Sequence, residues 1–160
     1  MRIAFPLLAA IVLLATGCNR SQTISTPEGE VTVTSKDKDS GTFTFTGKDG
    51  QKMTMDAGGG QLPADYPKDI PVYKDAKIVV TQTISERNGR NLVLESGDTA
   101  EVIAEFYKKE LAAREWTIEN TMAAGGMNMM SATKDRRQLT VNITDADGKR
   151  TVMQFVGDEQ

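Results

Sequence analysis

The strongest constraint on the fold is a period-two alternation of apolar and polar residues that recurs along most of the chain. It begins in three short segments, whose apolar members are Val31 and Val33, Phe43 and Phe45, and Met53 and Met55. Alternation of β-branched and aromatic residues with polar residues is typical of strands with one buried face. Residues 29–57 are therefore predicted to form a three-stranded antiparallel β-meander. A sheet of this size is not stable alone, so we expect it to cover another part of the protein.

The second half of the chain shows the same alternation around one helical segment. The expected strands are residues 78–84, 91–95, 116–122, 127–133, 139–143 and 151–156. Asn88-Gly89 is a hairpin signal between the first two, and Asp98 with Glu101 resembles a capping box that begins a helix ending near Arg114. Residues 77–160 are thus predicted to be an α+β domain of order ββαββββ, an antiparallel sheet with one helix packed on one face.

Helical spacing predicts which residues of that helix face the core. Ile103, Phe106, Tyr107 and Leu111 form one apolar stripe, and we expect Ile103 and Phe106 to be buried. Glu105 with Lys109 and Glu110 with Arg114 are acid-first pairs four residues apart, typical of a solvated helix face. Before this domain, residues 58–76 contain three consecutive glycines and three prolines and are predicted to be an extended connector.

The N-terminus has the features of a targeting segment. Arg2 precedes an apolar run over residues 3–14, and Ala15-Thr16-Gly17 places small residues before Cys18, the single cysteine of the chain. The run is too short to span a bilayer comfortably and ends in small residues, which favours cleavage. Residues 1–17 are predicted to be a signal peptide, and residues 18–28, rich in Ser, Thr and Gln, a flexible tether.

Residues 15–18 resemble the lipobox of bacterial lipoprotein signal peptides. The resemblance implies cleavage before Cys18 and lipidation of its thiol and new amino terminus; the alternative is an ordinary thiol in a removable leader. Ala15 stands where the lipobox usually has Leu, and Leu14 lies one residue earlier. Inner-membrane retention typically goes with Asp after the cysteine, whereas Asn19 follows here, so we expect the outer membrane with the protein facing the periplasm.

A second resemblance covers roughly residues 62–156. The motifs that carry it are Leu62-Pro63, Tyr66-Pro67, Ile70-Pro71 and Tyr73, then Ser96, Asp98, Val102, Phe106-Tyr107-Lys108, Leu111 and Trp116. They resemble a set of uncharacterised bacterial envelope lipoproteins with a proline-rich lead-in and a Phe-Tyr helix. Those relatives usually have Gly before the Trp, where this chain has Glu115. The resemblance implies fold and localisation and no activity.

Composition excludes several classes of function. The chain has no histidine, the commonest acid–base group at neutral pH and the commonest transition-metal ligand. With Cys18 lipidated, no thiol remains for a disulfide, a nucleophile or a cysteine-ligated metal. Residues 18–160 keep 18 of the 19 basic residues and all 22 acidic ones, a formal charge of −4. We therefore expect no nucleic-acid partner.

The sharpest chemical candidate is a cluster of methionines. Thioether sulfur suits Cu(I), and the candidate ligands are Met53, Met55, Met122, Met127, Met129, Met130 and Met153. Methionine also fills irregular cores, so the structural role is the favoured interpretation and copper binding the alternative.

Other charged motifs are interpreted as surface features. Asp145-Ala146-Asp147-Gly148 lacks the remaining ligands of a calcium loop and is expected to be a hairpin turn. Lys134-Asp135-Arg136-Arg137 is expected to be a solvated loop, with contact to lipid phosphate as the alternative. Asp65 with Asp69, and Glu101 with Glu105, are carboxylate pairs of the kind that acid–base catalysis uses, but exposed surfaces produce such pairs routinely.

The sequence therefore predicts a lipid-anchored, non-catalytic binding or scaffolding module with an unknown envelope protein partner. It names no catalytic residue, no metal ligand and no cofactor, and Cys18 is its one assigned site residue. A copper-handling protein and an enzyme of unknown reaction are the alternatives.

Overall fold

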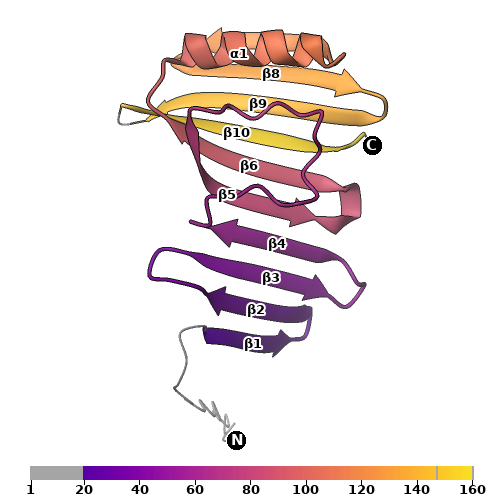
Figure 1. Cartoon of the computed structure of the whole chain (residues 1–160). Coiled ribbons are helices and arrows are strands. Elements are labelled where there is room, and N and C mark those ends of the chain that lie inside the picture. The colour runs from indigo at the N-terminus through magenta and orange to yellow at the C-terminus, as the bar shows by residue number, and fades with distance from the viewer. Residues whose placement is uncertain (1–19, 147, 160) are drawn as a thin grey trace, which may run out of the picture.

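A computed structural model describes residues 20–146 and 148–159, and it shows one antiparallel sheet of ten strands with a single helix on one face (Figure 1). The strand order is β1-β2-β3-β4-β5-β6-β10-β9-β8-β7. The elements are β1 Arg20–Thr26, β2 Gly29–Ser35, β3 Gly41–Gly47, β4 Lys52–Ala57, β5 Ala76–Ile84, β6 Gly89–Ser96, α1 Ala100–Ala113, β7 Thr117–Ala124, β8 Met127–Lys134, β9 Arg137–Ala146 and β10 Lys149–Asp158. The predicted signal peptide and Cys18 lie outside the described residues.

The α+β class and the order ββαββββ of the C-terminal half are confirmed, while the sheet is larger than predicted. The expected meander does not cover a face of that half. Its strands continue the same sheet, because β4 pairs with β5 from Met53↔Ile84 to Ala57↔Val80. Edge-to-edge pairing satisfies the backbone groups that a separate meander would leave open at its edge.

The expected tether over residues 18–28 is also corrected, because Arg20–Thr26 forms the edge strand β1. This strand pairs with β2 along its whole length, from Arg20↔Ser35 to Thr26↔Gly29. Its serines, threonines and Ile24 tolerate extended backbone, and threonine and isoleucine are strand formers. The polar composition of residues 18–28 indicated a tether. A two-residue turn, however, brings residues 20–26 beside β2, and the two segments pair as strands.

Two hairpins illustrate how turn residues set the register. Gly125 and Gly126 both have positive φ, 58° and 81°, and join β7 to β8 in a two-residue loop, as type I′ turns require. The predicted Asn88-Gly89 turn is different: the loop between β5 and β6 is a 3₁₀ turn over Ser85–Arg87 followed by Asn88 at φ 48°, and Gly89 already belongs to β6. Asn is among the residues that adopt this left-handed conformation most readily.

The helix begins one residue later than predicted. Thr99 is its N-cap, and its hydroxyl accepts a hydrogen bond from the Val102 amide at 3.4 Å. Asp98 instead accepts a hydrogen bond from the Tyr73 hydroxyl at 2.7 Å. The buried residues of α1 are Ile103, Ala104, Tyr107 and Leu111.

Phe106 lies at the margin of the core and is only partly buried, which corrects the expectation for this residue, whereas burial of Ile103 is confirmed. The Phe106 ring contacts the Tyr73 ring edge-on, with the ring centroids 5.0 Å apart. Phe106 therefore joins the helix to the connector rather than to the centre of the sheet.

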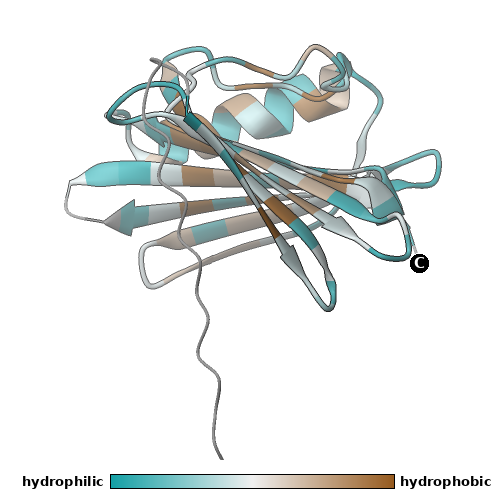
Figure 2. Ribbon diagram, turned by 90° about the horizontal axis from the view of Figure 1, so that it is seen from below, coloured by the Kyte–Doolittle hydropathy of each residue, from teal (hydrophilic) through white to brown (hydrophobic). Residues whose placement is uncertain are grey.

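The connector between β4 and β5 lies on the same face of the sheet as α1 (Figures 1 and 2). Tyr66, Ile70 and Tyr73 from this segment join the core. The buried Gln154 on β10 donates to the Pro71 carbonyl at 2.8 Å, and the Trp116 indole donates to the Asp69 carbonyl at 3.1 Å. Side-chain donors outside the segment therefore hold it through its backbone carbonyl groups.

The C-terminus of α1 is a Schellman motif. The Trp116 amide donates to the Leu111 carbonyl at 3.0 Å, and the Glu115 amide donates to the Ala112 carbonyl at 3.1 Å. Glu115 is left-handed, at φ 61°. The helix therefore ends with the geometry that glycine favours, although a glutamate occupies the position.

Within residues 20–146 and 148–159, no helix has the length and apolar character needed to cross a bilayer.

Candidate functional site

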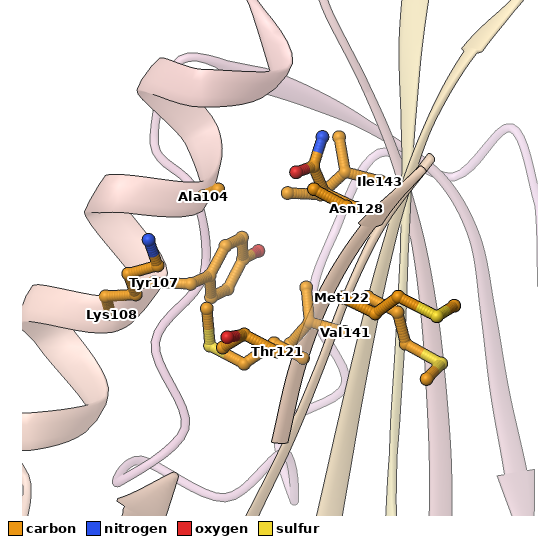
Figure 3. Close-up of a pocket in the computed structure, with 11 residues that line it drawn as sticks. Ala104, Tyr107, Lys108, Thr121, Met122, Asn128, Val141 and Ile143 are labelled. Atoms are coloured by element: carbon orange, nitrogen blue, oxygen red, sulfur yellow. The ribbon is translucent and has the colours of Figure 1, made fainter. Parts of the chain in front are cut away.

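A pocket of about 190 Å³ lies between α1 and strands β7, β8 and β9 (Figure 3). On the helix side it is lined in part by the small side chain of Ala104. Its floor is apolar, with Met130, Val141 and Ile143 buried in the sheet. The volume is below the roughly 300–1,000 Å³ of pockets for drug-sized ligands, so it suits a small molecule or one group of a larger one.

Tyr107 places a hydroxyl inside this layer. The residue has no exposed surface, and among the described residues no hydrogen-bond partner meets its hydroxyl oxygen. Figure 3 shows the ring reaching from α1 toward the sheet, between Asn128 and Thr121. Burial raises the pKa of Tyr107, partly opposed by the backbone of Tyr73 next to its oxygen, so the group is neutral and its O–H has no acceptor among the described residues. The hydroxyl has no surface accessible from the pocket, so a ligand oxygen would reach it only after neighbouring side chains shift.

The pocket opens at the edge of the sheet. Thr121 and Ala123, which line it, are exposed residues of the edge strand β7, and Lys108 is an exposed residue of α1. The arrangement combines an apolar floor, a neutral buried donor and a polar rim, which are the features of small-molecule binding sites.

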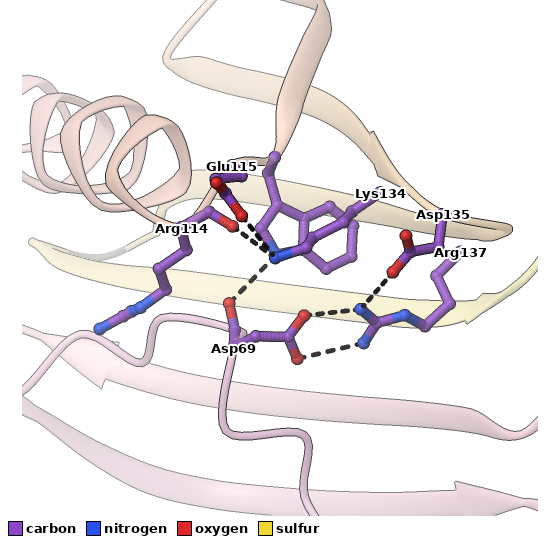
Figure 4. Close-up of polar contacts among 7 residues, drawn as sticks. Asp69, Arg114, Glu115, Lys134, Asp135 and Arg137 are labelled. Carbon is purple, nitrogen blue, oxygen red and sulfur yellow. Dashed lines mark hydrogen bonds and ion pairs between the residues drawn. The ribbon is translucent and has the colours of Figure 1, made fainter.

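A polar cluster at the ends of β8 and α1 away from the pocket joins the helix terminus, the connector and the β8–β9 hairpin (Figure 4). Arg137 donates to both carboxylate oxygens of Asp69, at 3.1 and 2.6 Å. Its guanidinium also lies over the Trp116 ring, 5.1 Å from the centroid. Lys134 donates to the Arg114 carbonyl at 2.7 Å and so caps the C-terminus of α1.

These contacts correct the interpretation of residues 134–137 as a solvated loop. Lys134 and Arg137 are half-buried and bonded, while Asp135 and Arg136 are exposed. The hydrogen bond from Arg137 lowers the pKa of Asp69, and the same contact raises the pKa of Arg137. The cluster is therefore an internal clamp.

The carboxylate pairs suggested by the sequence are separated by their own partners. Asp65 bonds Arg90 at 2.5 Å, whereas Asp69 bonds Arg137. Glu105 pairs with Lys108 rather than with the expected Lys109, while the pair Glu110–Arg114 forms as predicted, at 3.0 Å. Each of these carboxylates therefore has a partner of its own, which for Glu101 is Thr99.

The methionine cluster is divided between the two faces of the sheet. Met130 is buried on the face toward α1, whereas Met122 and Met129 are cross-strand partners on the opposite face. Figure 3 shows Met122 directed away from the helix. Met53 and Met55 lie on β4, with four strands between them and β8, a separation of about 24 Å. The sulfurs named from the sequence therefore do not form one copper site.

The calcium-like turn and the cysteine, which the sequence also suggested as sites, lie partly or wholly outside the described residues. Asp147 of the calcium-like turn lies outside the described residues, and among the described residues no group of three His, Cys, Asp or Glu side chains could hold a metal ion. Cys18, which the sequence predicts to be the lipid-attachment residue, lies outside them as well.

The pocket and the clamp were missed in the sequence because their residues are distant along the chain. Asp69 and Arg137 are 68 residues apart, and no local pattern links them. The pocket had a partial signal, since alternation places Asn128 and Met130 on the face of β8 that a covering helix would meet.

Residues 78–149 match the model of a family described as START domain-like. The match runs from β5 to the start of β10 and covers less than half of the chain. We found no significant match among the curated proteins or among the solved structures.

Proposed function

We propose that this protein is a lipid-anchored, non-catalytic binding module of the bacterial cell envelope, attached through Cys18 and facing the periplasm from the outer membrane. The observation that carries the binding role is the pocket between α1 and β7–β9, where the buried Tyr107 hydroxyl has no partner among the described residues. The ligand class that fits is a small apolar molecule or moiety with one oxygen that accepts a hydrogen bond. The ligand can be a free small molecule or a moiety that an envelope protein partner presents.

The lipid anchor is supported by the sequence of residues 1–18. A basic start, an apolar run and small residues precede the only cysteine. Acylation at two positions gives far more stable attachment than a single chain.

The pocket is tested by closing its mouth. Ala123 lines the pocket on β7, while its neighbour Ala124 points to the opposite face of the strand. We expect Ala123→Trp to abolish binding of 2-naphthol or octanoate, two apolar probes with an oxygen, in calorimetric titrations. Ala124→Trp is the matched control and should leave binding intact. Equal binding by both variants would remove the pocket as the site.

Tyr107→Phe tests the donor itself. The substitution keeps the ring and deletes the hydroxyl, so affinity for the probes should fall by roughly 10-fold, the cost of one hydrogen bond. If affinity is unchanged, the ligand does not use this hydroxyl.

The anchor is tested by Cys18→Ser in the full-length protein. We expect loss of labelled palmitate and release from salt-washed membranes, because no other spanning helix is found among the described residues. Asn19→Asp is the matched control: it should keep the label and move the protein from outer to inner membrane fractions. Sedimentation of Cys18→Ser with washed membranes would contradict the anchor.

A further inference from the structure

The face of the sheet opposite α1 carries an apolar surface over β1 to β5. One cross-strand row consists of Ile24, Val31, Phe45, Met53 and Ile84, each paired with the next. Cross-strand partners project on the same side of a sheet. The helix and the connector lie on the other side (Figure 2), so within the described residues no second layer covers this row.

A second, parallel row consists of Val33, Phe43 and Met55. Together the two rows are called the open apolar face. None of the eight side chains belongs to the buried core, and Ile24 and Val33 are 59% and 41% exposed. The reverse side of the same strands carries a row of threonines, Thr23, Thr32, Thr44, Thr54 and Thr83. The threonine side suits water, whereas the apolar side is the kind of contiguous patch that marks an interaction surface.

We infer that the open apolar face is covered by the same face of a second copy of this chain. The two rows contain no charged residue, so the surface offers nothing for a partner of complementary charge to recognise. It also contains no Trp, Tyr, Lys or Arg, the residues that anchor proteins at a bilayer interface. An uncharged apolar face is complementary to itself, which is the requirement of a two-fold symmetric interface.

The geometry of the face suits this arrangement, and its size determines how far the contact must extend. Sheets pack face to face about 10 Å apart, with side chains of the two faces interdigitating. Five strands about 4.8 Å apart and two residue rows about 6.8 Å apart make a face of roughly 24 by 14 Å. Two such faces bury about 650 Å² in total, short of the about 1,000 Å² of a specific interface, so the contact has to extend beyond β5.

The surface can extend to the neighbouring strands. On β10, Met153 and Phe155 project on the same side and are 44% and 36% exposed. With β6 and β10 included, the buried total becomes about 900 Å² by the same estimate, close to the lower limit of about 1,000 Å² for a specific interface.

Cysteine crosslinking in membranes of cells expressing the full-length chain tests the inference. Single cysteines at Val31, Val33, Phe43 and Phe45 scan the face, because in a two-fold dimer only positions near the axis meet their own copy. Thr32, Thr34 and Thr44 on the reverse side are the matched controls, and the unsubstituted chain gives the background from Cys18. With a bismaleimide spanning about 10 Å, we expect an adduct of twice the mass from at least one face position and from no threonine position.

A charge placed on the face provides the second measurement. Val33→Lys should reduce the best crosslink at least 10-fold and halve the mass of the detergent-solubilised protein in sedimentation equilibrium, whereas Thr34→Lys should change neither. A doubled mass that survives Val33→Lys, or equal crosslinking from both sides of the sheet, overturns the inference. An adduct with a protein of another mass also overturns the inference, because a different protein would then cover the face. A monomer whose face cysteines are protected from maleimide only while the bilayer is intact overturns it too, because the membrane would then cover the face.

Discussion

The guanidinium of Arg137 donates to both carboxylate oxygens of Asp69 and at the same time covers the Trp116 ring. Trp116 in turn donates to the backbone carbonyl of Asp69. These contacts fix the proline-rich connector to the end of α1 and to the β8–β9 hairpin, and they define one boundary of the layer that contains the pocket.

Replacing Asp69 by Asn should lower stability by about 1 kcal/mol at neutral pH, since a bidentate charge-assisted contact is lost while partial exposure limits its worth. The pKa of Asp69 is lowered in the fold, so its stabilisation is present above the unfolded value near pH 4 and is lost as pH falls through the folded value. The difference between Asp69→Asn and the unsubstituted protein in urea unfolding should therefore shrink below about pH 4.

Asp135→Asn is the control for that experiment. Asp135 also approaches Arg137, but at 3.7 Å and with its side chain 76% exposed. We expect almost no change. A pH-independent difference for Asp69→Asn would show that the loss came from packing rather than from charge.

Glu115→Gly should stabilise the protein by about 0.5–1 kcal/mol. Glu115 occupies the left-handed position of the Schellman motif, where a side chain costs about 1–2 kcal/mol, partly offset by the greater entropy of unfolded glycine. Its contact with Lys134, at 3.9 Å and 89% exposed, contributes little.

Ala113→Gly gives the opposite sign two residues earlier. Ala113 is an exposed helical residue, so glycine there should cost about 1 kcal/mol. Thermal melts of the two variants that shift in the same direction would contradict the assigned helix terminus.

Tyr107→Phe should leave the ligand-free protein as stable as before or raise its stability by up to about 1 kcal/mol, because it removes a buried hydroxyl without a partner. Tyr73→Phe is the comparison. Its hydroxyl donates to Asp98, which, together with burial, raises the pKa of Tyr73 to about 12. Loss of this bond to a charged acceptor should cost about 1.5–3 kcal/mol. Equal losses in chemical denaturation would show that Tyr107 has an acceptor in solution.

Titration with Cu(I) against a competing chelator should show no tight stoichiometric binding, because the methionines lie on two faces and on distant strands. Submicromolar affinity that disappears when Met122 and Met129 are both replaced by Leu, yet persists in Met130→Leu, would instead establish a thioether site on the open side of β7 and β8.

The sequence by itself determined the elements with strong local signals. Alternation predicted the strands from β2 onward, and helical spacing predicted α1 with Ile103 facing the core. It failed at β1, because a serine- and threonine-rich segment is a strand only when a neighbour pairs with it. It also misjudged Phe106, since spacing gives a face of the helix but not how far the sheet and connector extend beneath it.

Only the tertiary structure decided what the strands and charges do together. Joining β4 to β5 edge to edge leaves one face of β1 to β5 apolar and without a cover among the described residues, whereas a folded-over meander would have buried it. The same packing brings Asp69 to Arg137, and Tyr107 to a pocket under α1. Such contacts depend on strand order and layer geometry, which are long-range properties, whereas alternation and capping report only the preferences of neighbouring residues.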